Sequence, residues 1–72
     1  MGRILQWETV VMSRESAEHI WKSFEPTDPL IAFYIRKDLD TQDGHFVNVE
    51  LPLSDVAKVK EVVRKLAEGR AE

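Results

Sequence analysis

The chain has 72 residues, no cysteine and a formal net charge of −3. A chain this short forms one small domain that buries only about 60% of the surface its unfolded form exposes, so we expect a single domain over residues 1–69 and a frayed tail at 70–72. The lack of cysteine excludes disulfides and thiolate zinc sites and is consistent with the cytoplasm, where we expect the protein. The acidic excess disfavours a dedicated nucleic-acid binder, and no apolar run is long enough to cross a membrane.

The first predicted element is a strand over residues 3–12. Four residues alternate on one face, which we expect to point toward the core: Leu5, Trp7, Thr9 and Val11. Tryptophan, threonine and valine favour strands. A helix is the alternative, because three residues also lie at helical spacing: Ile4, Trp7 and Val11.

A helix is predicted from Ser13 to the residues before Pro26. Ser13 is a suitable N-cap, and Glu15 lies in the first turn, where the helix dipole favours an acidic side chain. Apolar residues then follow at helical spacing: Ala17, Ile20, Trp21 and Phe24. We expect Trp21 to be buried against the sheet.

Two further strands are predicted over residues 30–37 and 45–51. In the first, one face carries Ile31, Phe33 and Ile35, and the other carries Ala32, Tyr34 and Arg36. In the second, one face carries Val47, Val49 and Leu51, and the other carries Phe46, Asn48 and Glu50. Asp43 and Gly44 lie between the two strands and are typical of a hairpin turn.

The last predicted element is a helix over residues 54–69, with Ser54 as its N-cap and Gly69 at its end. Its apolar stripe is Val56, Val59, Val62, Val63 and Leu66. We expect Val63 to be buried and the basic residues to be solvated: Lys58, Lys60, Arg64 and Lys65. The alternative is that this helix with its basic flanks binds a partner.

These elements predict an α+β fold with the order β-α-β-β-α. The right-handed crossover places the first helix on one face of a three-stranded antiparallel sheet. The second helix is expected on the same face, where it can bury its valines. The expected strand order is 1-3-2, with the third strand in the centre. This arrangement resembles a ferredoxin-like fold that lacks its last strand.

The acidic stretch at residues 38–50 partly matches a calcium-binding EF-hand loop. The second half of that spacing is matched by Asp43, Gly44, Phe46 and Glu50. Asp38 and Asp40 match the first half only if Thr41 or Gln42 is an insertion. An EF-hand also needs a helix after the loop, and Pro52 would interrupt it. We therefore expect a turn that binds no metal.

No catalytic arrangement is recognisable. His19 lies opposite the apolar stripe of its helix, and His45 stands alone at a strand end. No serine is placed for a Ser-His-Asp arrangement, and the three glycines form no phosphate-binding loop. We expect no catalytic residue, no cofactor and no enzyme activity.

The open face of the predicted sheet is the candidate interaction surface. It would carry Gln6, Glu8, Tyr34, Arg36, Phe46, Asn48 and Glu50. An open sheet with aromatic side chains is similar in topology to RNA-recognition motifs, whose aromatics stack bases, although their basic, glycine-rich motif is not present. Single-stranded nucleic-acid binding through Tyr34, Arg36 and Phe46 is therefore the alternative function.

We expect instead a domain that binds proteins, and the expected partner is a second copy of the same chain. The first strand would lie at the edge of the sheet, with unpaired backbone groups that invite another strand. A homodimer through this strand, or through the open sheet face, is the expected assembly. Binding to a different protein is the alternative assembly, and binding to a membrane is not expected.

Overall fold

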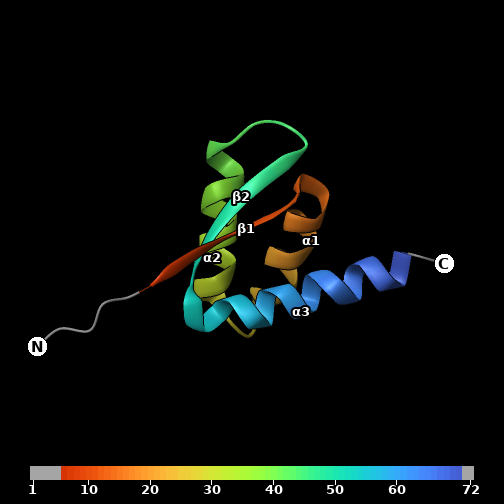
Figure 1. Ribbon diagram of the computed structural model, residues 1–72. Helices are drawn as coiled ribbons and strands as arrows, with labels where there is room; N and C mark the ends of the chain where they lie inside the picture. The colour runs from red at the N-terminus through yellow and green to blue at the C-terminus, as the bar shows by residue number, and fades with distance from the viewer. Residues whose placement is uncertain (1–5, 71–72) are drawn as a thin grey trace, which may run out of the picture.

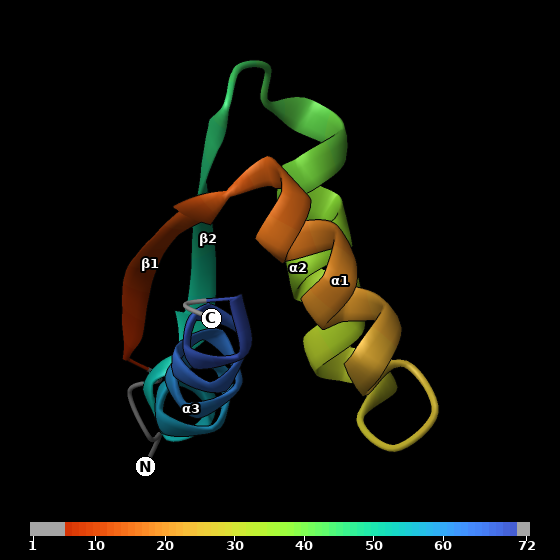
Figure 2. The same ribbon diagram turned by 90° about the vertical axis from the view of Figure 1, so that its right-hand side faces the viewer.

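The computed structural model describes residues 6–70. The elements follow in the order β1 (Trp7–Ser13), α1 (Arg14–Phe24), α2 (Pro29–Thr41), β2 (Phe46–Pro52) and α3 (Leu53–Arg70). The two strands form one antiparallel sheet. In Figure 2, α1 and α2 lie together on the β2 side of the strand pair, β1 lies at its outer margin, and α3 lies against the strands at the end where the chain leaves β2.

The junction of β1 and α1 is as expected from the sequence. Ser13 ends the strand and caps the helix, because its Oγ accepts the backbone N–H of Ser16 at 3.1 Å. On α1 the buried residues are Ala17, Ile20 and Phe24. Trp21 packs against the core but is only partly buried, so the prediction that it is buried was only partly correct. The guanidinium of Arg36 lies over its ring, 5.0 Å from the centroid.

The strand predicted over residues 30–37 is wrong, because this segment belongs to α2 (Figure 1). The apolar residues also recur at helical spacing, and that pattern continues beyond residue 37: Ile31, Ala32, Ile35 and Leu39 are all buried. Pro29 occupies the first turn, where its missing N–H costs nothing. Asp28 precedes it, and its carbonyl accepts from Ala32.

The predicted three-stranded fold is therefore also wrong. Within residues 6–70 the sheet has two strands, β1 and β2, and three helices pack with them. The α+β class and the antiparallel pairing of the first and last predicted strands are retained. The likeness to a ferredoxin-like fold and the strand order 1-3-2 are lost, because both needed a strand at residues 30–37.

The core lies between the inner face of the two strands and the helices. Val10 of β1 is paired with Val49 of β2, and Met12 with Val47, and all four are buried. The expected inner face of β1 was the opposite one: Trp7 and Val11 point outward, and Leu5 lies outside the described residues. The alternation predicted for β2 is confirmed.

The last helix begins at Leu53, directly after β2, and continues to Arg70, one residue past Gly69. Ser54 therefore lies inside the first turn, and its prediction as the N-cap was wrong. Val56 and Val59 are buried, whereas Val63 is only partly buried. Figure 1 shows the second half of α3 extending past α1. The exposed Arg64 contacts Glu61 and Glu68, both at 2.5 Å, and its pKa is raised chiefly by the hydrogen bond and charge of Glu61.

Candidate functional site

The direction of the backbone groups of β1 follows from two hydrogen bonds at the ends of the strand pair. The N–H of Arg14 donates to the carbonyl of His45, and the N–H of Leu53 donates to the carbonyl of Gln6, both at 2.8 Å. Hydrogen-bonded and non-hydrogen-bonded pairs alternate in an antiparallel ladder. The even-numbered residues of β1 therefore bond to β2, and the odd-numbered residues direct their N–H and C=O groups away from it. We call these odd-numbered residues the β1 edge: Trp7, Thr9 and Val11.

The opposite edge of the sheet is closed by side chains from the last part of α2 and from the residue that follows it. The Asp38 carboxylate accepts the N–H of Glu50 at 2.9 Å. The Gln42 amide accepts the N–H of Asn48 at 2.8 Å and donates to the carbonyl of the same residue at 2.9 Å. These side chains replace a neighbouring strand. The β1 edge has no such cover among the described residues.

The β1 edge is also apolar. Trp7 is 47% exposed and Val11 is 60% exposed, and Phe46 on the neighbouring strand is 65% exposed. The ring of Trp7 meets that of Tyr34 edge-on, with the centroids 5.4 Å apart. No residue of the β1 edge is charged and none is proline. The one charged residue of β1 is Glu8, whose carboxylate contacts Lys60 on the inner side. The edge itself therefore carries neither a charged side chain nor a proline that would oppose pairing with another strand.

Of the seven residues expected on an open sheet face, the structure brings three together on the outer face of β2: Phe46, Asn48 and Glu50. Gln6 is exposed just before β1. Glu8 lies on the inner side of β1, where its carboxylate contacts the Lys60 ammonium at 3.0 Å.

Tyr34 and Arg36 do not belong to the sheet, because both are on α2. Tyr34 lies beside Trp7, whereas Arg36 covers Trp21 and is 3.8 Å from the carboxylate of Asp40. The three side chains expected to bind nucleic acid therefore come from different surfaces. Nucleic-acid binding stays a prediction.

The acidic stretch joins α2 to β2 and is not a hairpin turn between strands. Asp38 is 8% exposed, and its carboxylate accepts the N–H of Glu50 at the edge of β2. Gly44 has a φ of 105°, a conformation that glycine adopts without strain. Among residues 6–70, no three acidic or histidine side chains are grouped closely enough to hold a metal ion.

We expect no calcium binding to this stretch below millimolar concentration. Asp38 is committed to a backbone N–H, and Asp40 lies on the exposed side of α2 beside Arg36, so the carboxylates do not converge as calcium ligands do. Isothermal titration with calcium chloride checks this. A micromolar site that is lost in Asp43→Ala would contradict it.

The same connection is held by Arg14, for which the sequence pattern predicted no role. Its guanidinium donates to three backbone carbonyls at the end of α2 and in the following turn: Leu39 at 3.2 Å, Gly44 at 2.8 Å, and Gln42. An arginine in the first turn of a helix is unfavourably placed for that helix's own dipole. This unfavourable position was the one available sign of a tertiary role.

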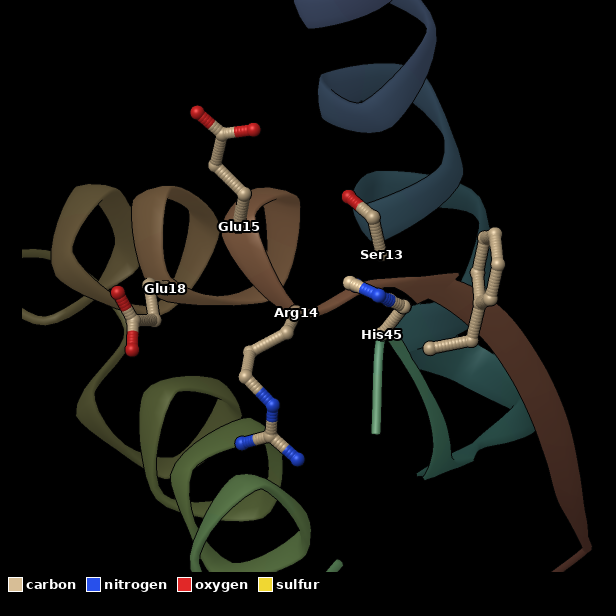
Figure 3. A pocket seen from close by; sticks show the side chains of 6 residues that line it. Ser13, Arg14, Glu15, Glu18 and His45 are labelled. Atoms are coloured by element: carbon tan, nitrogen blue, oxygen red, sulfur yellow. The ribbon is translucent and has the colours of Figure 1, made fainter. Parts of the chain in front are cut away.

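A shallow depression of about 580 Å³ lies where β1 meets α1. Figure 3 shows its lining, with Glu15 and Glu18 projecting from α1 and His45 on the other side, near Ser13. The Ser13 hydroxyl is used as the helix cap and donates to the hydroxyl of Ser16 at 2.9 Å. No described contact joins Ser13 to His45 as a nucleophile and base would be joined. The other histidine, His19, is exposed, as expected.

Comparison with known proteins provides no identification. The chain matches no protein-family model, no curated protein and no solved structure. In residues 6–70, no helix is both long enough and apolar enough to cross a membrane.

Proposed function

We propose that this protein is a small non-enzymatic binding domain that acts as a homodimer through the β1 edge. The observation that carries the proposal is the direction of the backbone groups at Thr9 and Val11, which point away from β2. The side chains of Asp38 and Gln42 close the other edge of the sheet, so within residues 6–70 one edge remains for strand addition. Added strands are a common mode of protein recognition.

A second copy of the chain supplies a suitable partner strand. Two identical edges related by a two-fold axis run antiparallel, which is the geometry of a closed dimer. The joined sheet has four strands, because each copy contributes two. Two copies of the three-stranded sheet expected from the sequence would have made six. Pairing also brings Trp7 and Val11, which are exposed in the single chain, beside the outer-face side chains of the partner's β1.

We place the dimer in the cytoplasm. The chain has no cysteine, and a small domain without disulfides suits a reducing compartment. Self-association then takes the place of the covalent cross-links that stabilise many small domains.

The test is a proline at the β1 edge. Thr9→Pro removes an N–H that points away from β2, so the single chain keeps its own ladder. The dimer loses the two symmetric bonds donated by this N–H, and we expect its dissociation constant to rise about 10- to 100-fold. Sedimentation velocity over a concentration series measures the change.

Thr9→Ala is the matched control, because it removes the same side chain and keeps the N–H. Positions 8 and 10 are unsuitable for proline, since their N–H groups bond to β2. Phe46→Glu tests the rival dimer through the outer sheet face. Dissociation by Phe46→Glu but not by Thr9→Pro would contradict the edge dimer, as would a wild-type chain that stays monomeric at high micromolar concentration.

A further inference from the structure

We infer that the two copies pair with the two-fold axis at Thr9, so that Trp7 of each chain lies opposite Val11 of the other. This inference rests on the proposed edge dimer and adds its register. The register decides which surface the assembled sheet presents.

The direction of the backbone groups limits the possible registers. Only Trp7, Thr9 and Val11 offer N–H and C=O groups along the edge, so odd-numbered residues must pair with odd-numbered residues of the partner. The two-fold axis can then pass through any single residue of β1. Each choice pairs a different set of side chains.

An axis at Glu8 would place the two Glu8 carboxylates directly opposite each other, and like charges in that position are destabilising. An axis at Val10 would pair Trp7 with the partner's Ser13, whose side chain is already used as the cap of α1. An axis at Val11, Met12 or Ser13 would leave Trp7 beyond the end of the partner's β1, and an axis at Trp7 would leave Thr9 and Val11 beyond its beginning. These registers are therefore disfavoured.

The axis at Thr9 avoids all three problems. It pairs the two Thr9 residues at the centre. On each side of them, Trp7 of one chain lies opposite Val11 of the other, and an aromatic residue opposite a β-branched residue is a favourable cross-strand pair. Trp7 and Val11 are both exposed in the single chain and both lie on the outer face. In this register they form one apolar strip across the middle of the four-stranded sheet.

A single-cysteine scan tests the register, because the chain has no cysteine of its own. Directly opposite residues in an antiparallel pair have Cα atoms close enough for a disulfide, whereas diagonal neighbours are about 7–8 Å apart and are too far. The variants are Glu8→Cys, Thr9→Cys, Val10→Cys and Val11→Cys. Each is oxidised at low micromolar concentration and analysed on non-reducing gels.

We expect Thr9→Cys to form covalent dimers at least about tenfold faster than the other three variants. Trp7→Cys and Val11→Cys should cross-link with each other when mixed and neither should cross-link readily alone. Ser23→Cys, at an exposed position on α1, measures the rate of random collision.

The outcomes separate the register from the dimer. Fastest cross-linking at Glu8, Val10 or Val11, with a dimer in sedimentation, would overturn the register and leave the edge dimer intact. A rate at Thr9 no higher than that at Ser23, in a chain that sediments as a dimer, would overturn the inference and direct attention to the sheet face. A monomer in sedimentation would overturn the register together with the proposed function.

Discussion

Truncating Ile35 to alanine is expected to lower the free energy of unfolding by about 2–5 kcal/mol. The side chain of Ile35 is fully buried in the middle of α2, where it packs in the core between the strands and α1. A domain of this size has a total stability of only about 5–10 kcal/mol. We therefore expect a large fall in the denaturant midpoint, measured by circular dichroism at fixed protein concentration.

The matched control is Phe33→Ala, two residues earlier on the same helix. Phe33 is 57% exposed, because the helix turns it away from the core. We expect a loss below about 1 kcal/mol, which is typical of surface positions. In a strand, residues 33 and 35 would share one buried face, so equally large losses at both positions would contradict the helix.

Replacing Arg14 with alanine is expected to lower the free energy of unfolding by about 1–3 kcal/mol. Three backbone carbonyls would lose their guanidinium donors: Leu39, Gln42 and Gly44. The first of these carbonyls lies in the last turn of α2, where a cation also complements the helix dipole. Urea unfolding gives the loss, and hydrogen exchange should show faster opening of residues 42–45.

Arg14→Lys is the control that keeps the positive charge. A single ammonium cannot reproduce the planar set of donors that reaches three carbonyls at once. We expect lysine to restore less than half of the stability lost in Arg14→Ala. Full restoration by lysine would show that charge alone stabilises the end of α2, and an unchanged midpoint in Arg14→Ala would show that the contact contributes nothing.

Local signals predicted much of the chain correctly. Ser13 caps α1 as expected, because N-capping depends on groups only three residues apart. The strand containing Val47, Val49 and Leu51 alternates between strongly apolar and polar residues, so its inner face is unambiguous. The final helix was predicted to within one residue at each end, because its long apolar stripe fits the helical period only.

The candidate site was only partly predictable. An open first strand was expected, and the β1 edge is its counterpart in the structure. The open three-stranded face was not found, because Tyr34 and Arg36 belong to a helix. The side chains that close the other edge, Asp38 and Gln42, act on a strand several residues away in sequence, and no local pattern indicates such a contact.

The sequence by itself determined the α+β class, the N-cap at Ser13, the strand at β2 and the helix at α3, because each depends on neighbouring residues. Only the tertiary structure decided between helix and strand at α2, where the apolar residues from Ile31 to Ile35 satisfy both periods over so short a stretch. It also decided the inner face of β1. Val10 and Met12 are apolar, and so are Trp7 and Val11. Because both faces carry apolar residues, alternation cannot indicate which face is buried. The buried face is decided by the register of β1 against β2, which places Val10 and Met12 beside Val49 and Val47 in the core.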